Sequence, residues 1–194
     1  MRARTARQER STRETRISAE VRVDGDGKSA IELPLPFFAH MVDSFVRYSG
    51  MDVELHGDGD VQVDSHHLVE DTGLVLGAAV SDALGGRAGI RRFGDATAPL
   101  DEALVRCAVD YGKRPHVVYD MERLQGRIND FDVSVLGEFV KGYAQSAGAT
   151  IHLDCIRGDN LHHIAEAAFK ALGLASREAF SVIGTAIPST KGTL

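Results

Sequence analysis

The segment HMVDSFVRYSGMDVEL, His40–Leu55, decides the fold, because a second segment, EFVKGYAQSAGATIHL at Glu138–Leu153, aligns with it without a gap. In each segment a stripe of apolar residues at helical spacing runs into a glycine, Gly50 or Gly148. Glycine at this place is typical of a helix C-cap, and the residues that follow alternate between apolar and polar as in a strand. A helix followed by a strand therefore occurs twice, 98 residues apart (138 minus 40), which predicts an internal duplication.

The elements around the repeat occur in a similar order in both halves. In the first half the pattern predicts strands at 12–25, 28–33, 51–56 and 60–64, and helices at 37–48 and 66–84. In the second half it predicts strands at 91–100, 102–111, 115–120 and 150–156, and helices at 133–147 and 160–174. We therefore expect one α+β domain, residues 1–194, with two similar halves at about 10–90 and 91–187. Each half is expected to be an antiparallel sheet with helices on one face.

The composition argues against several classes of protein. The chain has 194 residues, of which 43% are hydrophobic, enough for one globular core. A net charge of -6 does not indicate a nucleic-acid-binding surface, and no window approaches the ~18 apolar residues of a membrane span. The basic segment 1–16 is not followed by an apolar run, so it does not predict a signal peptide. Cys107 and Cys155 lie in apolar contexts, and we expect buried thiols in a cytoplasmic protein.

Histidines are the unusual feature of the sequence. The stretches DSHHLVED and GDNLHHIAEAAF share the spacing HHxxE, one in each half. On a helix, positions i, i+3 and i+4 share a face, whereas adjacent residues point about 100° apart. Each glutamate can therefore converge with either histidine of its pair, and the other histidine must serve a second ion or a second chain. The residues concerned are His66, His67, Glu70, His162, His163 and Glu166.

Two such helices can supply ligands to two metal ions. His40 and His152 lie in the repeated segments 40–55 and 138–153 and are left over, one for each metal. The total is three histidines and one glutamate per ion, a nitrogen and oxygen site that suits manganese, iron or zinc. A single HHxxE on a surface helix would be weak support for a metal, but two copies at matched places favour one. We interpret His56 and His116 as ordinary strand or loop histidines.

Several longer motifs resemble one enzyme family. The stretches RETRI, FFAHM, DSHHLVEDTG, PLDEAL, GDNLHHIAEAAFKAL and PSTKG look like those of imidazoleglycerol-phosphate dehydratase of histidine biosynthesis, in the same order, from about Arg10 to Leu194. The resemblance implies a duplicated unit of the ribosomal protein S5 domain 2-like type. It also implies a homo-oligomeric shell of about 24 subunits, with sites at subunit interfaces and two manganese ions in each active site.

The resemblance further implies roles for individual residues. The family's metal ligands fall on His40, His66, His67, Glu70, His152, His162, His163 and Glu166. Its substrate-binding positions fall on Glu14, Arg92, Arg114, Ser189 and Lys191, the last two in a C-terminal tail at 188–194. The candidates for proton transfer are Glu14, Glu70 and Glu166, of which we favour Glu14. Ala39 and Ser44 stand where the family usually has aspartate and glutamine, which affects the surroundings of His40 but removes no ligand.

The implied reaction removes water from imidazole glycerol phosphate to give imidazole acetol phosphate. The proton that leaves sits on a carbon with no neighbouring carbonyl, and general-base catalysis alone contributes only ~10²–10⁴-fold. Metals on both ring nitrogens would favour the imidazolate, whose electron density can expel the adjacent hydroxyl. Two alternatives stay open. One is a non-catalytic metal-binding shell protein, and the other is a dinuclear hydrolase, which would want a carboxylate bridging metals ~3.5–4 Å apart.

Overall fold

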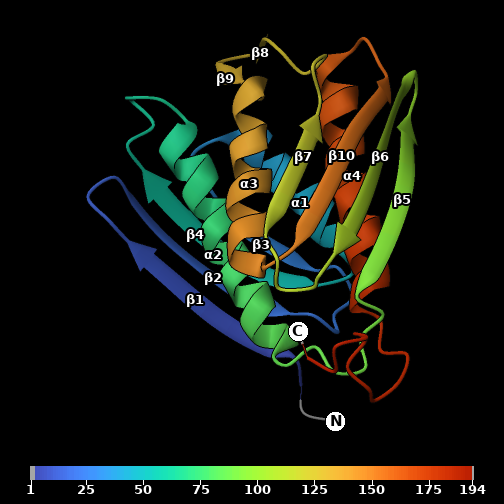
Figure 1. The fold of residues 1–194 in the computed structure, drawn as a ribbon. Coiled ribbons are helices and arrows are strands. Elements are labelled where there is room, and N and C mark those ends of the chain that lie inside the picture. Colours follow the sequence, from blue (N-terminus) through green and yellow to red (C-terminus); the bar gives the residue numbers. More distant parts are fainter. Residues whose placement is uncertain (1–2, 194) are drawn as a thin grey trace.

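The computed structural model describes residues 3–193 (Figure 1). Met1, Arg2 and Leu194, the last residue of the predicted tail, lie outside this range. The first half contains β1 (Thr5–Ser11), β2 (Thr15–Arg22), β3 (Ser29–Glu32), α1 (Pro36–Ser49), β4 (Asp52–Gly59) and α2 (His66–Leu84). The second half contains β5 (Phe93–Leu100), β6 (Ala103–Asp110), β7 (His116–Asp120), β8 (Arg127–Ile128), β9 (Phe131–Asp132), the 3-10 helix η1 (Val133–Val135), α3 (Leu136–Ala147), β10 (Thr150–Arg157) and α4 (Leu161–Phe180).

The two halves form separate sheets with the same strand order. The first sheet runs β1-β2-β4-β3 and the second β5-β6-β10-β7, which confirms the predicted duplication and the α+β class. Each sheet is mixed and not purely antiparallel, because β3 pairs with β4, and β7 with β10, in parallel. The reason is the repeated unit itself: a helix connects the two paired strands, and such a crossover returns the chain in the same direction.

The helices lie between the two sheets (Figure 1). Helix α2 packs on β1 and β2, α4 packs on β5 and β6, and the halves meet where α2 contacts α3 and α1 contacts α4. The core at this junction is aromatic, with fully buried Phe38, Phe45, Phe139 and Tyr143. In both halves the strand residues that point away from the helices are exposed or partly exposed, so each sheet has one open face.

The structure differs from the predicted elements at three places: one predicted strand is absent, one strand was not predicted and one helix is longer than predicted. Residues 60–64 form a turn and not a strand, because the amide of Asp60 bonds to Glu14 O and Val63 stays 67% exposed. Strand β1 was missed because its charged sequence TARQERS shows no apolar alternation at the edge of the sheet. Helix α4 continues to Phe180, since Ala175 and Ala179 extend the buried stripe beyond the predicted end.

Two helix pairs approach closely through glycines. A Cβ at Gly77 of α2 would lie 2.4 Å from the carbonyl oxygen of Tyr143 in α3, and one at Gly73 would lie 2.4 Å from Phe139 O. In α4, Gly173 faces the carbonyl oxygen of Phe45 in α1, with 2.7 Å for a Cβ. The absence of a side chain at these positions therefore sets the distance between the halves.

Arg87 connects the two halves through a buried guanidinium. Its side chain donates to the carbonyl oxygens of Tyr111 at 2.8 Å, Gly148 at 3.1 Å and Ala147 at 2.5 Å. Ala147 and Gly148 end α3, where unpaired carbonyls and the helix dipole favour a cation. Burial lowers the pKa of Arg87, yet these carbonyl bonds let the charge stay inside the protein.

The turn before β3 makes folding stability depend on pH. Asp52 accepts the amide N–H groups of Asp26 at 2.8 Å and Lys28 at 3.0 Å. Burial alone raises the pKa of Asp52, but these N–H groups and the Arg22 guanidinium outweigh it and lower the pKa from 3.8 to about 2. A lowered folded-state pKa stabilises the protein above pH 3.8, and this contribution is lost as the pH falls toward about 2.

We therefore expect the melting temperature of the wild-type protein to fall more steeply over this acid range than that of Asp52→Asn. Asparagine can accept the same N–H bonds but does not titrate. Thermal unfolding followed by circular dichroism from neutral pH down to about pH 2 measures both slopes. Parallel slopes for the two proteins would contradict the assignment.

Candidate functional site

Each HH pair occupies the first turn of its helix, α2 or α4. Asp64 accepts the amide N–H of His66 at 2.8 Å, and Asn160 accepts that of His162 at 2.9 Å. In both halves a side-chain oxygen thus accepts the amide N–H two residues further along, but Asn160 is the N-cap of α4, whereas Asp64 lies one residue before Ser65, the N-cap of α2. The neighbouring Asp159 is 92% exposed at its side chain, and the N-cap of α4 is Asn160.

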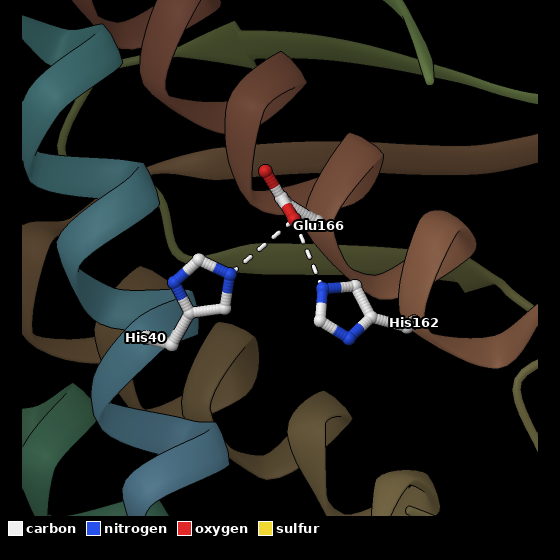
Figure 2. A group of neighbouring side chains, drawn as sticks. All are labelled: His40, His162 and Glu166. Carbon is white, nitrogen blue, oxygen red and sulfur yellow. Dashed lines mark hydrogen bonds and ion pairs between the residues drawn. The ribbon is translucent and has the colours of Figure 1, made fainter. Parts of the chain in front are cut away.

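The first cluster, the His40 group, consists of His40, His162 and Glu166. Figure 2 shows His40 reaching from α1 toward His162 and Glu166 of α4. The Nε2 atoms of His40 and His162 lie 3.3 Å and 3.1 Å from Glu166 Oε2. The two imidazole rings are 5.6 Å apart. Two nitrogens and one oxygen therefore face one point from two helices, a donor set that suits a first-row divalent metal.

Lys170, one turn further along α4, holds the other oxygen of Glu166. Its Nζ lies 2.7 Å from Glu166 Oε1, and both side chains are 16% exposed. Partial burial alone would raise the pKa of Glu166, but Lys170 and then His162 and His40 lower it. The carboxylate is thus kept ionised with Oε2 turned to the two histidines.

The second cluster, the His67 group, consists of Glu14, Asp60 and His67. The Nδ1 atom of His67 lies 3.2 Å from both carboxylate oxygens of Asp60 and 3.8 Å from Glu14 Oε2. The hydrogen bond to Asp60, more than the nearby charge of Glu14, raises the pKa of His67. Glu14 comes from the turn between β1 and β2, so three separate segments build this group.

The structure decides which histidine goes with each glutamate of HHxxE. The first histidine of each pair meets the glutamate four residues later: His66 Nε2 is 3.6 Å from Glu70, and His162 Nε2 is 3.1 Å from Glu166. The rings of adjacent histidines are 6.0 Å apart in α2 and 6.3 Å apart in α4, nearly perpendicular in both. The second histidine of each pair therefore points to other partners.

Glu102 is a partner that the sequence reasoning missed. Its Oε2 lies 2.7 Å from Nδ1 of His163, and its Oε1 accepts the amide N–H of Asn160 at 2.8 Å. The His163 bond, followed by backbone N–H bonds, lowers the pKa of Glu102 to about 2. The signal was present, because Glu102 lies in PLDEAL directly before β6, just as Glu14 lies in RETRI directly before β2.

His152, also predicted as a ligand, lies on the opposite side of its sheet. It is exposed on β10 between two residues, Ile151 and Leu153, that are buried against the helices. Among residues 3–193, neither the His40 group nor the His67 group combines ligands from both HHxxE helices. One chain therefore keeps the His40 group, the His67 group and His152 apart, with His152 alone on an open sheet face.

The cationic pocket is built by Arg92, Arg114, Ser189 and Lys191. These residues line one cavity of about 710 Å³, although they come from three segments of the chain. Arg92 holds Asp110 with two bonds of 2.6 Å and 2.9 Å and donates to Pro188 O at 2.7 Å, which ties the tail to β5 and β6. Side chains of this kind bind phosphate groups. Glu14, the fifth predicted substrate residue, lies instead in the His67 group.

Family and curated-sequence comparisons agree with one another. The family model described as imidazoleglycerol-phosphate dehydratase matches residues 34–176. A dehydratase of that name from Bordetella avium (strain 197N) is 46% identical over 194 residues, which is 98% of this chain and 100% of the relative. Another, from Azoarcus sp. (strain BH72), is 47% identical over 188 residues, covering 95% and 96% of the two chains.

Solved structures give the same result for the fold. The crystal structure of IGPD from Pyrococcus furiosus in complex with (S)-C348 superposes with a TM-score of 0.83 at 38% identity, covering 96% of this chain and 99% of the other. The imidazoleglycerol-phosphate dehydratase of Staphylococcus aureus N315 superposes with a TM-score of 0.81 at 29% identity, covering 92% and 99%. No described helix is long and apolar enough to cross a membrane.

Proposed function

The chain belongs to the imidazoleglycerol-phosphate dehydratase family, and from this premise we propose that it dehydrates imidazole glycerol phosphate at a site that holds two manganese ions. Membership makes it a lyase of histidine biosynthesis. The observation that carries the proposal is the His40 group, in which two imidazole nitrogens converge on one oxygen of Glu166. The same family resemblance is the basis for choosing manganese among the metals that this donor set suits.

The remaining predicted ligands suggest how two ions are held. His66 with Glu70 offers a second nitrogen and oxygen pair, while His67 and His163 point away from the glutamates of their own helices. When bound to both ring nitrogens of the substrate, metal ions would stabilise the imidazolate that helps the adjacent hydroxyl to leave. The His40 group holds one carboxylate, Glu166, and Lys170 occupies its second oxygen, which argues against a carboxylate bridging two metals as in a dinuclear hydrolase.

We further propose that the chain works as a homo-oligomer of about 24 subunits with sites at the interfaces. The separation of the predicted ligands within one chain supports this, because the His40 group offers three donor atoms and needs further ligands to complete a metal site. His152 also supports it: its cross-strand neighbour Val118 on the open sheet face is 36% exposed, and Ile156, four residues further along β10, is 46% exposed. A neighbouring subunit would cover these apolar side chains and receive the histidine.

Glu14 is our candidate for moving the proton of the substrate. Its side chain is 54% exposed and lies 3.8 Å from Nδ1 of His67, beyond hydrogen-bond distance, so it can approach a ligand. The turn that carries it is held in place, since Thr12 Oγ1 accepts the amide N–H groups of Glu14 and Thr15 at 3.0 Å each. Glu166, by contrast, is held by Lys170 and is better suited to binding metal.

The carboxylate of Asp71 supports the same turn. It accepts a hydrogen bond from the Thr15 hydroxyl and one from Arg10 at 2.9 Å, and it is only 7% exposed. Its position suggests that it stabilises the turn that presents Glu14.

The direct test is an activity assay with and without metal. We expect the purified protein to convert imidazole glycerol phosphate to imidazole acetol phosphate, to lose this activity after chelation, and to regain it with Mn²⁺. Full activity of the metal-free protein would contradict the proposal. Complete assembly of Mn²⁺-loaded protein without turnover would instead favour the non-catalytic shell protein.

Lys191→Ala tests the proposed phosphate pocket. A lysine that binds the phosphate in the ground state and the transition state alike should raise KM about 10–100-fold when removed, corresponding to a lost charged hydrogen bond. The turnover number kcat should change little. Lys28→Ala removes the same charge from an exposed site elsewhere and should alter neither constant. A fall in kcat with an unchanged KM for Lys191→Ala would count against the phosphate role.

A further inference from the structure

Glu14 and Glu102 occupy equivalent places in the duplicated fold. Each directly precedes the second strand of its sheet, β2 or β6, and each lies near the second histidine of an HH pair. Their surroundings nevertheless differ. Glu102 bonds to Nδ1 of His163 at 2.7 Å and is anchored by backbone N–H groups, whereas Glu14 stays 3.8 Å from His67 and is half-exposed.

In the first half Asp60 takes the place that Glu102 has in the second. Both oxygens of Asp60 lie 3.2 Å from Nδ1 of His67, and its own amide bonds to Glu14 O at 3.0 Å. Asp60 belongs to a longer loop: the chain covers seven positions from Gly59 to His66 (66 minus 59) but only five from Arg157 to His162 (162 minus 157). The extra length therefore accommodates a second carboxylate beside the histidine.

A carboxylate at Nδ1 determines what the rest of the ring can do. An ionised carboxylate can only accept a hydrogen bond, so the Nδ1 atom that faces it must carry the proton. In a neutral imidazole the lone pair is then on Nε2, which is the atom left to bind a metal. Asp60 therefore imposes the Nδ1-protonated tautomer on His67, and Glu102 imposes it on His163. The two halves reach the same result with carboxylates from different places in the fold.

We propose that Asp60 and Glu102 are matched positioning residues that present Nε2 of His67 and His163 to metal, and that Asp60 thereby leaves Glu14 unbound for proton transfer. This inference rests on the proposed function for the metal and for Glu14. Without Asp60, the nearest carboxylate to Nδ1 of His67 is that of Glu14, which would then be held as Glu102 is. The two substitutions should therefore differ in their effect on turnover.

The experiment compares Asp60→Ala and Glu102→Ala in the full-length protein. Electron paramagnetic resonance measures the concentration of free Mn²⁺ and so gives the affinity of each protein for the ion. We expect this affinity to be about 10–100-fold weaker in both variants, which is the usual effect of losing a partner of a metal-bound histidine. At saturating Mn²⁺, kcat should fall further in Asp60→Ala than in Glu102→Ala. Asp60→Asn retains an acceptor oxygen and should recover much of the affinity. Asp58→Ala removes an exposed carboxylate two residues earlier, at the end of β4, and should change neither quantity.

A second readout does not depend on the loaded enzyme. In metal-free protein at about pH 9, where neutral imidazole predominates, ¹⁵N shifts should show His67 protonated at Nδ1 in the wild type, and this preference should be lost in Asp60→Ala. Protonation at Nε2 in the wild type, or wild-type Mn²⁺ affinity in Asp60→Ala, would overturn the inference. If the wild type bound Mn²⁺ but lacked dehydratase activity, the proposed function would fail while these two readouts still tested the positioning role.

Discussion

Replacing His162 by alanine is expected to lower kcat for dehydration by more than about 100-fold, beyond the usual loss for residues that only support a metal ligand. His162 contributes one of two imidazole nitrogens that face Glu166 Oε2 in the His40 group. Its removal leaves a single nitrogen and an oxygen, too few to hold the ion firmly. Steady-state kinetics at several Mn²⁺ concentrations would measure the loss, and His66→Ala should behave similarly.

The control for this variant is His116→Ala, which removes an exposed histidine from β7 that belongs to neither ligand group. We expect it to retain wild-type kinetics. Because metal binding is linked to assembly, His162→Ala should also show a lower apparent mass in light scattering if the sites join subunits. Full activity of His162→Ala would refute the two-metal site.

Gly77→Ala is expected to destabilise the protein by about 3 kcal/mol, although it adds only one methyl group. The new Cβ would lie 2.4 Å from Tyr143 O and 2.9 Å from Ala147 N, both backbone atoms of α3 that cannot rotate away. Helices α2 and α3 would have to separate along the junction of the halves. In an unconstrained helix the same change would stabilise the protein by about 1 kcal/mol. The sign of the change in the free energy of unfolding therefore shows whether the close contact with α3 is present.

Chemical denaturation and thermal unfolding would measure this effect, with a fall in melting temperature of about 6–12 °C expected. Gly86→Ala is a suitable control, because an added Cβ there meets none of the described residues within 4 Å. It should change the free energy of unfolding by no more than about 0.5 kcal/mol. Equal stability of Gly77→Ala and Gly86→Ala would show that the two helices can adjust without cost.

The architecture could be predicted from the sequence because its signals are local and occur twice. Apolar stripes ending in Gly50 and Gly148 mark two helices, and both glycines adopt the left-handed conformation at the helix ends. The match between 40–55 and 138–153 then predicts that the halves share one topology, as the two strand orders confirm. Strand β1 escaped prediction because an edge strand needs only one partner and no apolar alternation.

The sequence by itself determined the duplicated α+β fold, the family and the types of residue available for metal binding. Only the tertiary structure decided how these residues combine. It joined His40 of α1 to His162 and Glu166 of α4, placed His152 on an open sheet face, and assigned Asp60 and Glu102 to the second histidines.

The physical reason is that helical spacing relates only residues on one helix. It leaves Glu70 and Glu166 free to meet either histidine, whereas the actual partner is set by side-chain direction and by loops that arrive from other segments. Glu14 and Glu102 show this most clearly. They occupy equivalent positions, but only Glu102 bonds to its histidine, because the longer loop between β4 and α2 places Asp60 beside His67 in the first half. Contacts between distant segments are therefore where two similar halves acquired different chemistry.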